Sequence, residues 1–137
     1  MAAAPSGAGA LSRPLLRAAY ATVMAGGSCF LAVAAFTQFA RTDLDISRDT
    51  LSLYLHGPWG LMLRCMYGLL AGSVIVLGAA LYRHADGPRR SAAAPLLWGV
   101  AALGLLGVAV GDSWLPGYAP LVWPLVHGVS AMTAFLC

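Results

Sequence analysis

The sequence has little charge and no lysine. Only 9% of its 137 residues are charged, whereas 60% are hydrophobic, and a soluble domain carries about 25% charged residues. A soluble fold of this length could not hide so much apolar surface, because small domains bury only about two thirds of what the unfolded chain exposes. The composition therefore excludes an ordinary soluble domain and predicts an integral membrane protein.

Two other patterns are missing as well. All eight basic residues are arginines, scattered along a chain of net charge +3, with no basic stripe interleaved with aromatic residues. The three cysteines, Cys29, Cys65 and Cys137, lie in apolar segments and form no CxxC pair and no metal-ligand spacing. We therefore expect no nucleic-acid partner, no disulfide framework, no metal site and no other cofactor.

Long apolar runs are what the sequence does contain. After a segment of small residues at 1–12, which we expect to be disordered, apolar runs cover about 15–39, 58–82, 94–115 and 118–137. Each is close to the roughly 20 residues with which a helix crosses a bilayer, and a helix pairs its own backbone polar groups in lipid. The sequence thus predicts an all-α, multi-pass transmembrane bundle of four membrane helices, formed by residues 13–137.

The arginines predict the orientation of these helices. Arg13 and Arg17 precede the first run, and Arg83, Arg89 and Arg90 follow the second, whereas the loop after the third run has none. Cytoplasmic loops carry an excess of arginine and lysine. We therefore expect the chain in the cytoplasmic membrane with its N-terminus in the cytoplasm and its first and third loops outside. The first loop has two arginines, but three aspartates offset them.

Small residues and prolines suggest how the helices pack. Gly68 and Gly72 form a GxxxG pattern in the second run, and Gly107 and Gly111 form another in the third. Because this spacing lets two helix backbones approach closely, it predicts contact between the second and third helices. Pro124 removes a backbone hydrogen bond and is expected to kink the fourth helix.

Three ionisable residues, Arg64, Asp112 and His127, lie inside the apolar runs. A charge at the bilayer centre costs at least about 2.5 kcal/mol, so such residues usually face the bundle interior and pair. With a rise of about 1.5 Å per residue, all three fall at the outer level of the bundle in this topology. We predict that Arg64 pairs with Asp112 and that His127 lines the same outward-facing polar pocket. Three residues of the first loop are expected to cover it: Asp49, Tyr54 and His56.

Each of these residues also has a simpler interpretation. Arg64 can extend its side chain to the lipid headgroups. Asp112 can be a hydrated residue at the interface beside Trp114, and His127 can be a packed histidine bonded to a neighbouring helix.

The predicted function is that of a non-enzymatic membrane protein, an assembly, sensing or small-molecule-binding subunit. One alternative is an intramembrane metal-dependent hydrolase, with Asp112 and His127 holding a metal-bound water. Zinc takes at least three protein ligands, and His56 is the remaining candidate. The other alternative is a proton-coupled small-molecule carrier, with Asp112 and His127 as the relay. The expected partner is the lipid bilayer, and a homo-oligomer or a larger membrane complex is a further candidate.

Two stretches carry a family resemblance: "LSLYLHGPWGLMLRCMYGLLAGSVIVLGAAL" at 51–81 and "GDSWLPGYAPLVWPLVHGVSAMTAF" at 111–135. Over about residues 20–137 the chain resembles the bacterial and archaeal membrane family catalogued as domain of unknown function 998. The resemblance implies a multi-pass helical fold without an established activity. Because family members usually have six helices, it also implies that the last helices are lacking here and that the chain is either a truncated gene product or a fragment. The residues that it emphasises are Tyr54, Gly57, Gly60, Asp112, His127 and Gly128.

Overall fold

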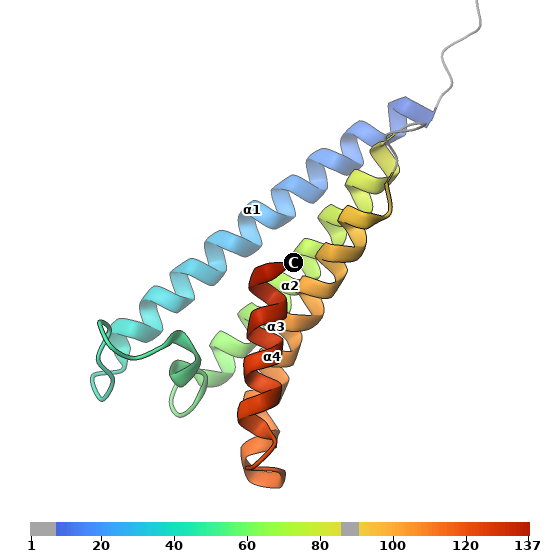
Figure 1. Ribbon diagram of the computed structural model, residues 1–137. Coiled ribbons are helices and arrows are strands. Elements are labelled where there is room, and N and C mark those ends of the chain that lie inside the picture. Colours follow the sequence, from blue (N-terminus) through green and yellow to red (C-terminus); the bar gives the residue numbers. More distant parts are fainter. Residues whose placement is uncertain (1–7, 86–90) are drawn as a thin grey trace, which may run out of the picture.

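The computed structural model describes residues 8–85 and 91–137, of which the side chains of 8–12, 112–116 and 118 lie outside the description. Within these ranges the chain is helical and has no strand, so the all-α class is confirmed. The elements, shown in Figure 1, are α1 (Ala8–Ala40), the 3-10 helix η1 (Leu51–Leu55), α2 (Gly60–His84), α3 (Ala93–Tyr118) and α4 (Trp123–Leu136). Because α1 begins at Ala8, residues 8–12 are helical where we expected disorder, and 1–7 lie outside the described residues.

In the described part of the chain, three helices, not four, are long and apolar enough to cross a membrane. They are Arg13–Ala40, Gly60–His84 and Ala93–Gly111. The prediction of a fourth spanning helix is wrong: α4 has 14 residues and is about 21 Å long, whereas the hydrocarbon core is about 30 Å thick. Three apolar helices of this kind nevertheless indicate a membrane protein.

Proline explains why α4 starts late. The expected run began at residue 118, but the chain first makes a turn in which the N–H groups of Val122 and Trp123 both donate to the carbonyl of Ala119, each at 3.0 Å. Pro124 then lies in the first turn of α4, where a missing N–H has no helical partner to lose. The predicted kink is therefore absent, because Pro124 starts the helix instead of interrupting it.

The helices pack in a row. Among the described residues, α1 packs on α2, α2 on α3, and α3 on α4, while η1 contacts the first three helices. In Figure 1, α4 runs back along α3, and its end lies beside the middle of the α2–α3 pair. The start of α1, the end of α2 and the start of α3 share one end of the molecule. Residues 41–59 and the 119–122 turn form the other, which we call the loop end.

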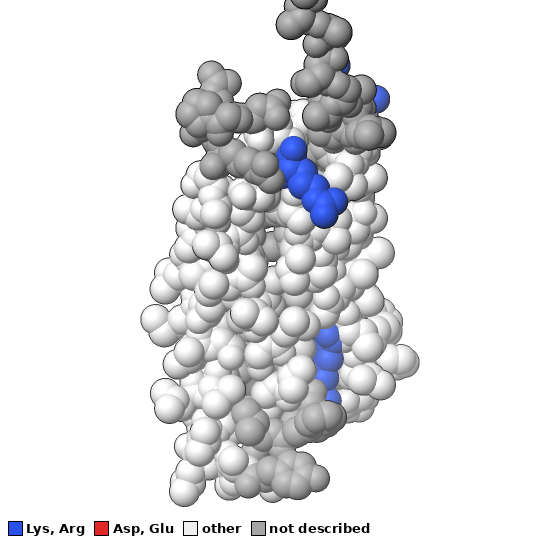
Figure 2. All heavy atoms as spheres, turned by 90° about the vertical axis from the view of Figure 1, so that its right-hand side faces the viewer, with Lys and Arg blue, Asp and Glu red and all other residues white. Residues whose placement is uncertain are grey.

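The two ends differ in charge, and the surface between them is apolar. The loop end carries two arginines and three aspartates. Arg13, Arg17 and Arg83 lie towards the opposite end. On the face shown in Figure 2, basic side chains are visible towards the top and again in the lower part, and no acidic side chain is visible. Many large apolar side chains are exposed along the helices. A helical surface of this kind suits lipid better than water.

The main core lies at the loop end, where η1 inserts between the helices. Tyr54 and Leu55 of η1 are fully buried and cluster with Leu63 and Tyr67 of α2 and with Val108 of α3. A second, smaller cluster joins α1 and α2 near the opposite end. The first loop is therefore held against the helices by its own apolar residues, and this placement builds the site described next.

Candidate functional site

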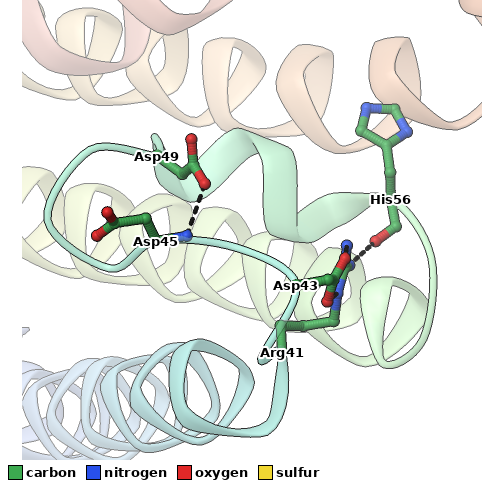
Figure 3. Close-up of polar contacts among 5 residues, drawn as sticks. All are labelled: Arg41, Asp43, Asp45, Asp49 and His56. Carbon is green, nitrogen blue, oxygen red and sulfur yellow. Dashed lines mark hydrogen bonds and ion pairs between the residues drawn. The ribbon is translucent and has the colours of Figure 1, made fainter.

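Arg41 holds the two halves of the first loop together. Its Nε and Nη2 donate to the two carboxylate oxygens of Asp43 at 2.7 and 2.6 Å, and its Nη1 donates to the backbone carbonyl of His56 (Figure 3). The Arg41 side chain is only 10% exposed, and that of Asp43 is 63% exposed. The hydrogen bond from Arg41 lowers the pKa of Asp43 below its ordinary value. The group of Arg41, Asp43 and the His56 carbonyl, here called the Arg41 clip, ties the end of α1 to the turn before α2.

The turn after the clip has little conformational freedom. Gly57 has a φ of +75°, which disfavours side chains, and a Cβ there would lie 3.0 Å from Nη1 of Arg41. Trp59 also has a positive φ, of 69°. A Cβ on Gly60 would overlap the backbone carbonyl of Leu55. Gly57 and Gly60, which the family resemblance emphasises, therefore each have a steric reason to be glycine.

The aspartates of the loop fold it locally. Asp45 accepts hydrogen bonds from the backbone N–H and the hydroxyl of Ser47 at 2.8 and 2.6 Å, and these bonds lower the pKa of Asp45. Asp49 in turn accepts a bond from the backbone N–H of Asp45 at 2.7 Å. Arg48 lies 3.7 Å from Asp45, so both arginines of this loop have an acidic partner.

Tyr54 is the buried polar residue of η1. Its side chain has no exposed surface, and its hydroxyl has no hydrogen-bond partner among the described residues. Burial is the main cause that raises the pKa of Tyr54, and the negative charge of Asp49 raises it further. Asp49 and Tyr54, both predicted to belong to the site, therefore lie close enough to interact electrostatically.

A pocket lies between the first loop and helices α2, α3 and α4. Its volume is about 330 Å³, at the small end of the range of ligand pockets, which is about 300–1,000 Å³. His127 is one of its walls, but Arg64 is not among the described lining residues and the lining is mainly apolar, so this is not the polar pocket that was predicted around Arg64 and Asp112. The lining residues are Thr50, Leu51 and Ser52 from the loop, Tyr67 from α2, Leu105 and Val108 from α3, and His127, Ala131, Ala134 and Phe135 from α4.

The polar groups of this pocket come from the first loop, α2 and α4. The hydroxyls of Thr50 and Ser52 are 2.9 Å apart and share a hydrogen bond. His127 packs on Trp123 with 5.9 Å between ring centroids, and His56 packs on the same indole at 6.3 Å. In Figure 3 the imidazole of His56 points away from Arg41, on the far side of the backbone that the clip holds. The Arg41 clip thus holds the backbone of His56, and the side chain of His56 contacts the first turn of α4.

The structure gathers some predicted site residues and leaves others untested. His127 lines the pocket, while Asp49, Tyr54 and His56 lie in the loop beside it and are not among its described lining residues. Arg64 is half-buried on α2, and its Nε has no hydrogen-bond partner among the described residues. Asp112 is on α3, but its side chain lies outside the described residues, so its pairing with Arg64 stays a prediction.

Several contributors were not predicted from the sequence. Arg41 was counted only as a loop charge, although Asp43 two residues later is a signal for a local ion pair. Thr50 and Ser52 were not singled out because hydroxyl residues are common in loops. Trp123 gave no signal, since its contact with two histidines depends on how the 119–122 turn aims α4.

The predicted contact between α2 and α3 is present, but the glycines at which two helix backbones come closest lie between α3 and α4. A Cβ on Gly104 would lie 2.6 Å from two backbone atoms of α4, the amide nitrogen of Ala134 and the carbonyl oxygen of Ser130. Gly107 faces the Ser130 side chain in the same way. Around Gly68 and Gly72, in contrast, nothing lies within 4 Å of an added Cβ. The predicted contact through Gly68 and Gly72 is therefore wrong, because GxxxG spacing permits close approach without choosing the partner. Gly111 is buried in α3.

No three His, Cys, Asp or Glu side chains come together as metal ligands within the part of the chain whose side chains are described. That part includes His56, His127 and Asp49 but not the carboxylate of Asp112. The pocket lining itself offers hydrogen bonding by hydroxyls and an imidazole, together with apolar contact. Comparison with family models, with curated proteins and with solved structures finds no match to this chain.

Proposed function

We propose that this chain is a non-enzymatic membrane protein that binds a small molecule in the pocket beside His127. The observation that carries the proposal is the pocket itself, about 330 Å³ in volume and walled by the first loop and three helices. A concave, mainly apolar site with a few convergent polar groups is the usual form of a ligand site. The buried η1 and the Arg41 clip support the proposal because they hold one wall in place.

The chain lies in the cytoplasmic membrane with its N-terminus in the cytoplasm. Support comes from Arg13, Arg17 and Arg83 near the end opposite the loop end and from the excess of arginine in cytoplasmic segments. A cysteine placed at Ser47, with the native cysteines replaced by alanine, should react with a membrane-impermeant maleimide added to intact cells. Reaction only after cell lysis would overturn this orientation.

An intramembrane hydrolase and a proton-coupled carrier are the alternatives. Both need the carboxylate of Asp112 to act together with His127. No observation on the described residues favours either, whereas the pocket supports binding directly.

The proposed binding can be tested with the photoreactive hydrophobic probe trifluoromethylphenyldiazirine, using the full chain in lipid nanodiscs. Residues that face only lipid should be labelled in proportion to probe concentration, whereas Leu105 and Ala134 should show an additional component that saturates. Ala131→Trp places a large side chain in the pocket wall and should abolish that component. Met132→Trp makes the same addition at an exposed position and should leave it unchanged.

Two results would refute the binding function. One is purely linear labelling of the pocket residues in the unmodified chain. The other is a saturable component of full size in Ala131→Trp when the unfolding temperature shows that the variant is folded.

A further inference from the structure

We infer that the ligand is a neutral, single-chain amphiphile, such as a long-chain alcohol or its ester, that enters the pocket from the bilayer. This inference rests on the proposed binding function and names the class of molecule that fills the site. Three features carry it: the charge of the lining, the position of the hydroxyls and the direction in which the pocket runs.

The lining favours a ligand without formal charge. None of the described lining residues is Asp, Glu, Lys or Arg, and an ion placed among mainly apolar side chains loses its hydration without gaining a counter-ion. Neither sign of charge therefore meets a permanent counter-ion: no acidic lining residue compensates an ammonium head, and the only described lining group that can become positive for a carboxylate or phosphate head is the imidazole of His127.

The hydroxyls suit an oxygen-containing head. Thr50 and Ser52 are bonded to each other at 2.9 Å, and each hydroxyl has one donor hydrogen and two acceptor lone pairs. One hydrogen of this pair is used in the mutual bond, and the other is left to be donated to a ligand. An alcohol or ester oxygen accepts such a bond, and an alcohol can also donate in return.

The pocket runs from the loop towards the lipid-facing surface. The lining includes both Thr50, which is exposed in the loop, and Phe135, which is 82% exposed on α4. His127 and Phe135 are eight residues apart on α4, or about 12 Å along the helix axis. A molecule with its head at Thr50 would extend its chain past Leu105 and Val108 to the acyl chains of the bilayer. This arrangement fits a ligand supplied by the membrane better than one supplied by water.

The test compares headgroups on one chain length. Decanol with a diazirine at its chain end is photolysed with the protein in phosphatidylcholine nanodiscs, and labelled residues are located by mass spectrometry. Decanol, decanoate and decyltrimethylammonium compete at matched concentrations in the bilayer, and butanol tests the need for the chain. Decanol should compete about tenfold better than either charged probe, which corresponds to about 1.4 kcal/mol. Thr50→Val should reduce this preference, and Thr42→Val, the same change at an exposed loop residue, should not.

Each outcome separates the inference from the proposal on which it rests. If decanoate or decyltrimethylammonium competes as well as decanol, the neutral class is wrong although the pocket still binds ligands. If butanol competes as well as decanol, the need for a chain is wrong. An unchanged preference in Thr50→Val would refute the placement of the head. Absence of saturable labelling by any probe would refute the binding function itself.

Discussion

Replacing Gly104 by alanine should destabilise the packing of α4 on α3 and deform the pocket. The new Cβ would lie 2.6 Å from backbone atoms of Ser130 and Ala134, about 0.8 Å inside the 3.4 Å at which ordinary contact begins. Backbone atoms cannot rotate away as a flexible side chain can, so α4 has to move as a unit. Overpacking of this kind typically costs about 1–3 kcal/mol. Because Ala131 and Ala134 line the pocket, the saturable labelling should weaken as well.

Alanine also favours a helix over glycine by about 0.5–1 kcal/mol, so the effect of the contact needs a matched control. Gly99→Ala, on the same helix with nothing within 4 Å of the added Cβ, receives the same gain without the overlap. The free energies of unfolding of the two variants, measured by thermal and denaturant unfolding in lipid nanodiscs, should differ by about 1–3 kcal/mol. Equal stability of the two variants would refute the α3–α4 contact described here.

Three further predictions concern the first loop. Gly57→Ala should lower stability by about 1–2 kcal/mol, since an L-residue is strained at a left-handed φ; an unchanged unfolding temperature would contradict the +75° φ. The pKa of Asp43 is lowered by Arg41, so the Asp43 contribution is complete above the ordinary value of 3.8 and is lost as pH falls through the lower folded-state pKa. Asp43→Asn should therefore reduce the acid-induced loss of stability measured from about pH 6 to about pH 2, and an unaltered profile would show that the clip contributes nothing. Tyr54→Phe should leave stability unchanged or raise it, because an unpaired buried hydroxyl is costly; a clear loss would reveal a partner for that hydroxyl.

The sequence predicts those helices whose formation depends mainly on the length of an apolar segment. The first three runs were predicted as helices, and the structure has α1, α2 and α3 there, because a helix satisfies the backbone polar groups of a long apolar segment in lipid. The prediction of a fourth spanning helix failed because Pro120 and Pro124 change the backbone within a few residues. The apolar content that predicts a spanning helix is summed over about twenty residues and does not register so local a change. The pairing of the second and third helices was predicted correctly, but Gly68 and Gly72 are not what brings them together, since nothing lies within 4 Å of a Cβ added at either.

The candidate site was predictable only in part. His127 stood out because an imidazole in an apolar run is rare, and it does line the pocket. The Arg41 clip depends on the loop returning to place the His56 carbonyl beside the end of α1, and no local pattern encodes such a return. The same holds for the indole of Trp123, whose two imidazole neighbours come from distant parts of the chain.

The unequal charge of the two ends gives the described chain an electric dipole along its helices, which would lie across any bilayer that the three apolar helices cross. Arg13, Arg17 and Arg83 lie towards one end, while two arginines and three aspartates leave the loop end at −1. Moving one elementary charge across a membrane voltage of 100 mV changes its free energy by about 2.3 kcal/mol. A cell interior at negative voltage therefore stabilises one insertion direction, and loss of that voltage weakens the bias.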